Sequence, residues 1–109
     1  EADQVAAARL AALPAAEFDL SGYRQDKAVR AAVAKLWLAA GWKEADITAV
    51  WEGRIREGMT KEVALRAWGP VTGRHFTRVG RTSVEHYDVR GGSLTFHDGA
   101  LVSWSQYED

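Results

Sequence analysis

The stretch Arg56-Glu-Gly-Met-Thr-Lys-Glu-Val-Ala-Leu-Arg-Ala-Trp-Gly-Pro70 carries a start signal and a stop signal for one short helix. The Thr60 hydroxyl can cap the amino end of a helix, and Met59 before it can cover the first turn. Gly69 predicts a left-handed end to the helix, and Pro70 cannot continue it. Because a helix this short is unstable alone, we expect it to pack against the rest of the chain.

The residues on either side of this stretch have different periodicities. Before it, helices are expected over residues 2–13, from Asp26 to Gly41 and over 44–51. After Pro70 apolar and polar residues alternate, which predicts strands over 76–79, 84–89, 94–96 and 101–104. Gly91-Gly92 and Asp98-Gly99 are typical of two-residue hairpin turns. The sequence therefore predicts an α+β fold, with N-terminal helices packed on one face of a four-stranded (three to four) antiparallel meander sheet.

Length and composition limit the classes of protein to consider. The 109 residues predict a single domain, and the formal net charge of −1 argues against nucleic acid as the main partner. The absence of cysteine excludes disulfides and thiolate zinc sites within this sequence. Because the sequence starts at Glu1 without an initiator methionine, we expect a trimmed or processed form, in which an upstream signal peptide or lipid-bearing cysteine would not be visible.

Several short motifs occur in an order that resembles the SmpA/OmlA family. They are Gly58-Met-Thr60, Val63, Trp68-Gly-Pro70, Glu85-His-Tyr87 and Leu94-Thr-Phe-His-Asp-Gly-Ala-Leu101. That family includes the small lipoprotein of the outer-membrane β-barrel assembly machinery, and the same pattern is similar to the repeat unit of β-lactamase inhibitory protein. The resemblance covers residues 47–106 as a helix-plus-sheet unit and leaves residues 1–46 as an N-terminal helical extension. Tyr87 departs from the pattern, because envelope members often carry tryptophan there.

The resemblance implies a non-catalytic, protein-binding domain of the bacterial cell envelope or a secreted one. It implies an assembly or scaffold role. The protein would be either lipid-anchored on the periplasmic side of the outer membrane or secreted. The alternative that it implies is a secreted enzyme inhibitor of the β-lactamase-inhibitory-protein type. A fold shared with such proteins identifies no ligand. The partner expected in either case is another protein of the envelope or the secreted medium.

The two hairpin turns sort the strand residues onto two faces. With two-residue turns, Phe96 lies opposite Leu101, Val89 opposite Leu94, and Ser93 opposite Trp104. One face is then uniformly apolar and belongs under the helices: Tyr87, Val89, Leu94, Phe96 and Leu101. The other face is mixed, and the N-terminal helix could cover it or water could solvate it. We expect instead a contact surface for a protein partner or a second copy, which includes Val84, His86, His97, Val102 and Trp104.

Arg74, Arg78 and Arg81 form a basic run without a carboxylate before Glu85. They extend the candidate contact surface and could suit an acidic partner or anionic lipid headgroups. The alternative is a solvated loop.

Three histidines raise the possibility of a metal site or of catalysis. The predicted register places His86 opposite His97, with Asp88 as a diagonal third ligand. Two solvated histidines are the simpler interpretation, because no fourth ligand is evident. The serines of the strands also lack a nucleophile motif. We therefore expect no enzymatic activity, no cofactor and no metal ion.

Overall fold

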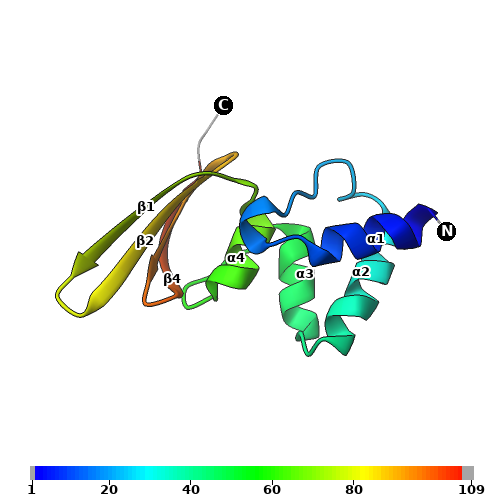
Figure 1. Ribbon diagram of the computed structural model, residues 1–109, viewed down its shortest axis with the longest axis horizontal. Helices are drawn as coiled ribbons and strands as arrows, with labels where there is room; N and C mark the ends of the chain where they lie inside the picture. Colours follow the sequence, from blue (N-terminus) through cyan, green and yellow to red (C-terminus); the bar gives the residue numbers. More distant parts are fainter. Residues whose placement is uncertain (1, 107–109) are drawn as a thin grey trace.

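The computed structural model describes residues 2–106 (Figure 1). Within these residues, helices come first and strands follow, so the predicted α+β fold is confirmed. The strands form a four-stranded antiparallel meander in the order β1-β2-β3-β4. The elements are α1 (Ala2–Ala12), η1 (Ala15–Glu17), α2 (Lys27–Ala39), α3 (Glu44–Glu52), α4 (Lys61–Trp68), β1 (Val71–Val79), β2 (Thr82–Val89), β3 (Gly92–His97) and β4 (Ala100–Gln106).

Local capping fixes several helix ends. The Asp26 carboxylate accepts a hydrogen bond from the backbone N–H of Val29 (3.1 Å), which starts α2 as the sequence predicts. Gly53 ends α3 in the left-handed region, with φ 69°. The Arg24 guanidinium donates to the carbonyls of Trp51 at the end of α3 and Ala67 at the end of α4. Arg24 thereby holds two helix ends together and satisfies carbonyls that lack intrahelical partners.

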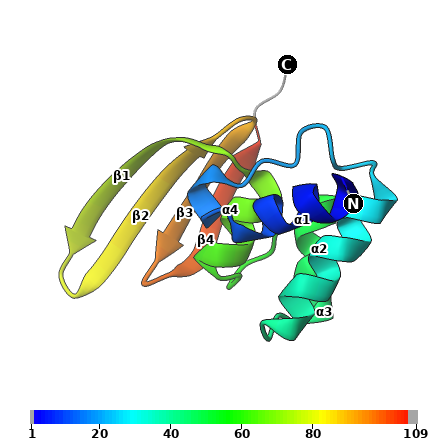
Figure 2. The same cartoon turned by 45° about the vertical axis from the view of Figure 1, so that its right-hand side comes forward.

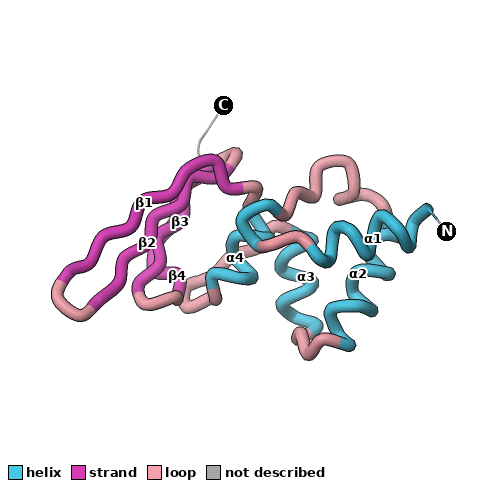
Figure 3. Tube along the Cα trace, in the orientation of Figure 1, coloured by secondary structure: helices cyan, strands magenta, loops and turns pink. Residues whose placement is uncertain are grey.

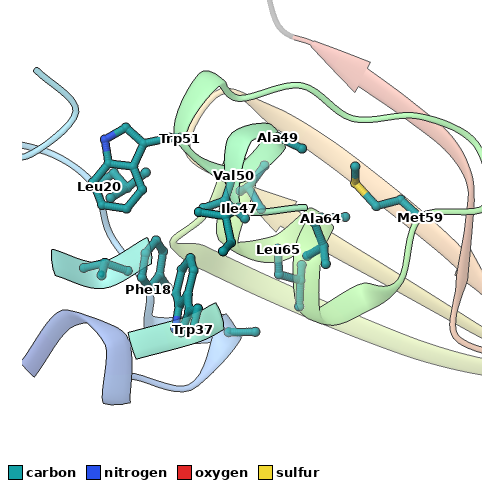
Figure 4. Packing of buried hydrophobic residues seen from close by; sticks show 14 of the residues in the cluster. Phe18, Leu20, Trp37, Ile47, Ala49, Val50, Trp51, Met59, Ala64 and Leu65 are labelled. Carbon is teal, nitrogen blue, oxygen red and sulfur yellow. The ribbon is translucent and has the colours of Figure 1, made fainter. Parts of the chain in front are cut away.

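A cation inserted among aromatic rings joins the N-terminal helices to α4. The guanidinium carbon of Arg66 lies 5.9 Å from the ring centroid of Phe18, 5.8 Å from Trp37 and 5.2 Å from Trp42. Trp37 and Trp42 stack at 4.1 Å, and Figure 4 shows Phe18 and Trp37 side by side. Arg66 also donates to the Leu13 carbonyl (3.3 Å). This cluster combines cation–π attraction with apolar burial.

The residues before α4 pair with the last strand. The backbone N–H of Gly58 donates to the Leu101 carbonyl (2.7 Å), and the N–H of Leu101 donates to the Met59 carbonyl (2.9 Å). Thr60 occupies the predicted N-cap position of α4, but its side chain makes no capping hydrogen bond. The N–H of Lys61 donates instead to the Gly99 carbonyl (3.3 Å). The turn between β3 and β4 therefore satisfies the first backbone N–H of α4, which has no intrahelical partner.

The apolar face of the sheet is confirmed under the helices, although the turn between β2 and β3 and the start of β1 differ from the prediction. Tyr87, Val89, Leu94, Phe96 and Leu101 are all buried. The turn between β2 and β3 is Arg90-Gly91, with Val89 opposite Gly92, where the sequence predicted Gly91-Gly92. The pairing moves by two residues, so each side chain stays on its predicted face. Strand β1 also begins at Val71, five residues earlier than expected.

The helices gather at one end of an elongated molecule and the strands at the other (Figure 3). The Cα extents are 50 × 34 × 19 Å. Helix α4 lies between the sheet and the remaining helices, and the β1–β2 hairpin projects beyond it (Figures 1 and 2). Among the described residues, none of the helices has the length and apolar character needed to cross a membrane.

Gly69 does not have the left-handed conformation that the sequence predicted. Its φ is −61° and its ψ is 177°, which any residue can adopt. The glycine is required for space: a Cβ there would lie 2.5 Å from the Leu65 carbonyl oxygen and 3.0 Å from the Phe18 carbonyl oxygen. The chain leaving α4 is therefore packed against Phe18, in the segment between η1 and α2.

Gly69→Ala should destabilise the fold by about 1–3 kcal/mol, because the methyl group would displace two backbone carbonyls. Gly91→Ala is the matched control, since a Cβ at Gly91 has no neighbour within 4 Å and its φ is not positive. The control should change stability by less than about 0.5 kcal/mol. Urea unfolding of both variants measures the difference. Equal midpoints would show that the close approach at Gly69 is wrong.

Arg66→Lys should lower the free energy of unfolding by about 1–2 kcal/mol, because an ammonium cannot stack between the rings and still reach Leu13. Glu62 forms an ion pair with Arg66 at 3.0 Å, but the Glu62 side chain is 66% exposed. Glu62→Gln should therefore cost less than about 0.5 kcal/mol. Thermal unfolding of both variants distinguishes the aromatic cluster from the ion pair. If Glu62→Gln loses more stability than Arg66→Lys, the ion pair and not the aromatic cluster is the main contribution of Arg66.

Candidate contact surface

The strand register divides the predicted contact residues between two faces of the sheet. We define the helix-side face as the one that carries Tyr87, Leu94 and Phe96, and the far face as the opposite one. Val84, His86 and His97 lie on the far face, as expected. Arg74 lies opposite Tyr87 and Arg78 opposite Ser83, so both arginines belong to the helix-side face. Arg81 lies in the β1–β2 turn. The predicted residues therefore do not form one surface.

A β-bulge in β4 corrects the predicted position of Trp104. Phe96 pairs with Leu101 but Thr95 pairs with Ser103, so Val102 is an extra residue in β4. Trp104 consequently lies opposite Leu94 on the helix-side face, where the sequence predicted Ser93 as its partner. Its side chain is 42% exposed because β4 is an edge strand. No glycine marks the bulge, so no local pattern in the sequence indicates it.

An aromatic row leads from the core to the exposed ring of Phe76, which is not among the predicted contact residues. Phe96 and Tyr87 are buried and meet edge to face at 5.7 Å. Phe76 continues the row at 6.1 Å from Tyr87, yet it is 56% exposed. Helix α4 does not reach this part of the hairpin, as Figure 2 shows. A two-residue turn at Gly80-Arg81 would have placed Phe76 on this face.

Arginines flank the exposed ring. Arg74 and Arg78 are two residues before and after Phe76, so all three side chains share the helix-side face. Among the described residues, no carboxylate forms an ion pair with Arg74, Arg78 or Arg81. The projecting hairpin is therefore a basic surface with an aromatic centre.

The nearest carboxylate on this face already has partners. Glu85 accepts hydrogen bonds from the Lys61 ammonium (3.1 and 3.3 Å) and from the Tyr87 hydroxyl (3.0 Å). The hydrogen bond to Glu85 raises the pKa of Lys61 above its usual value. Burial, followed by the hydrogen bond to Glu85, raises the pKa of Tyr87. The network ties the start of α4 to β2 and leaves the arginine charges uncompensated.

The histidines are not arranged as predicted. His86 lies opposite His75 on one side and Thr95 on the other, and His97 lies opposite Val84. The Nδ1 atom of His86 is 3.0 Å from the Thr95 hydroxyl, and its Nε2 atom is 3.4 Å from Asp88. Within residues 2–106, no group of three or more His, Asp or Glu side chains could hold a metal ion. The predicted pairing of His86 with His97 is therefore wrong, because the register places neither opposite the other.

A groove of about 380 Å³ lies where the segment before α2 meets the β2–β3 turn. Two of its charged side chains bind each other, because Arg90 donates to the Asp19 carboxylate (3.4 Å) as well as to the Ser21 hydroxyl (2.6 Å). The third, Arg24, donates to backbone carbonyls at the ends of α3 and α4. The backbone N–H of Ser21 contributes most to lowering the pKa of the Asp19 carboxyl. The polar contacts of this groove join the helical half to the sheet.

Comparison of the chain with known protein families, with functionally described proteins and with solved structures finds no match. The resemblance to the SmpA/OmlA family therefore stays a prediction from short motifs.

The raised pKa values of Lys61 and Tyr87 should weaken the fold at high pH. Such groups stabilise the folded state fully below the unfolded pKa, and this contribution disappears as the pH rises through the folded pKa. The ordinary values are 10.5 for Lys61 and 10.0 for Tyr87, so the loss should begin near pH 10. Tyr87→Phe removes one titrating group and should lose less stability between about pH 8 and pH 11. Urea unfolding at both pH values tests this, and an equal loss would contradict it.

Proposed function

We propose that this protein is a non-catalytic binding domain of the bacterial cell envelope, and that the helix-side face of its projecting hairpin contacts a protein partner. The observation that carries the proposal is the exposed Phe76 ring between Arg74 and Arg78. Aromatic and arginine side chains are the types enriched in the energetic centres of protein interfaces. The ring also rests on Tyr87, so little side-chain freedom is lost when it binds.

The basic charge of the surface supports a partner with an acidic surface. Three arginines and no carboxylate occur between Val71 and Val84. A partner with an acidic surface around an apolar pocket fits this arrangement, and the basic charge would speed its association. The envelope location, the assembly or scaffold role and the lipid anchor rest on the motif resemblance alone.

A second candidate function is inhibition of a secreted enzyme. The β1–β2 hairpin extends away from the helices (Figure 1), and a projecting hairpin can enter a concave active site. Arg74, Phe76 and Arg78 would then contact the enzyme. Inhibition of an envelope or secreted hydrolase by the purified protein would favour this candidate over a scaffold role.

Phe76→Ala should weaken capture of the partner by about tenfold or more, because aromatic anchors at interface centres dominate binding. A photo-crosslinking residue at position 76 should trap the partner when the protein is illuminated in the cell envelope, and one at position 77 should not. Thr77 pairs with Val84 on the far face, which makes it the matched control. Since Phe76 is exposed, the melting temperature of the Phe76→Ala variant should stay close to that of the parent.

Two results would overturn the proposal. Equal crosslinking from positions 76 and 77 would place the contact elsewhere. Binding to vesicles of anionic lipid that Arg74→Glu abolishes, without a protein crosslink at position 76, would replace the protein partner with a membrane surface.

A further inference from the structure

The outer edge of β4 is covered along only its first residues. The segment Gly58–Lys61 pairs with Gly99–Leu101 through the hydrogen bonds described above. Beyond Leu101, no described segment pairs with the outer edge of β4. The five residues Val102–Gln106 are all exposed. This part of the edge has backbone groups available for another strand.

The two edges of the sheet differ in how they are protected. Strand β1 carries Arg74 and Arg78 and a register shift between Val71 and Gly73. Charges and bulges of this kind discourage pairing between sheets. Val102–Gln106 has no charged residue and no proline. The bulge residue Val102 is the first residue beyond the covered part of β4, and the register is regular from Ser103 to Gln106.

We propose that a second copy of this chain pairs antiparallel with Val102–Gln106, so that the two four-stranded sheets form one continuous sheet across a twofold axis. The segment is self-complementary about Trp104, because Ser103 would lie opposite Ser105 of the second copy. A twofold axis brings like charges together, and this edge has none to repel. The two Trp104 rings would lie on the same face as a cross-strand aromatic pair.

The dimer goes beyond the proposed function and leaves its surface accessible. Strands β1 and β4 are the opposite edges of the sheet, so each copy would still present Phe76. A dimer would therefore carry two binding surfaces and gain avidity for a partner that is itself multivalent. Because Phe76 and Trp104 lie on different edge strands, variants at one site test it separately from the other.

Sedimentation of the purified chain from about 1 μM to 1 mM is the first test. We expect a monomer–dimer equilibrium, with concentration-dependent protection of the Ser103 and Ser105 region from hydrogen exchange. A chain that stays monomeric throughout this range would overturn the proposal, and so would a dimer whose protection lies elsewhere.

Charge variants test the register. In Ser103→Lys/Ser105→Lys the ammonium groups of the two copies would face each other, so dimerisation should weaken by at least about tenfold. Ser103→Glu/Ser105→Glu should behave likewise, and an equimolar mixture of the two variants should form a heterodimer. Thr77→Lys places one added ammonium group on β1, the opposite edge strand, and should dimerise like the parent. Circular dichroism confirms that each variant is folded.

The mixing experiment separates strand pairing from other modes of association. Heterodimers in the mixture support pairing about Trp104. If the lysine and glutamate variants both dimerise like the parent, the β4 edge is not the interface and the proposal is wrong. If neither variant dimerises and their mixture is also monomeric, the proposed register is wrong.

Discussion

The rest of the structure depends on one guanidinium, that of Arg66, whose side chain is only 11% exposed. Arg66 lies among three aromatic rings that come from outside α4 and holds the Leu13 carbonyl as well. Its Nε atom has no hydrogen-bond partner among the described residues, which is a cost of bringing a cation into this position. The arrangement is nevertheless useful, because an eight-residue helix such as α4 has too little apolar surface to bind both a sheet and a helical layer.

Helix α4 in turn decides which part of the sheet stays exposed. Lys61 fixes its first turn to Glu85, and Trp68 at its end donates to the Gly53 carbonyl. Leu94, Phe96 and Leu101 are buried on the sheet face next to α4, which contacts β4. The hairpin of β1 and β2 is longer than this cover. Phe76 is therefore exposed because α4 does not extend over the projecting part of the hairpin.

The sequence predicts what depends on periodicity and does not predict what depends on contacts between distant segments. The alternation of Tyr87 and Val89 places both residues on the buried face, although the turn lies one residue earlier than predicted and the pairing moves by two residues. The bulge at Val102 reverses the face of Trp104, and it accompanies pairing of β4 with a segment more than forty residues earlier. Gly69 likewise reflects a close approach to Phe18 that no local pattern indicates.

The hydrogen bond from Lys61 to Gly99 links the start of α4 to the last hairpin of the chain. During synthesis on the ribosome, α1, α2 and α3 emerge long before that hairpin exists. Until the hairpin has formed, the first turn of α4 lacks its hydrogen bond to Gly99, and the side of α4 that contacts β4 stays exposed. Contacts between such distant residues slow folding, and exposed apolar surface in the interval invites association with chaperones. The nascent chain is thus most vulnerable after Pro70 has been made and before Leu101 has left the exit tunnel.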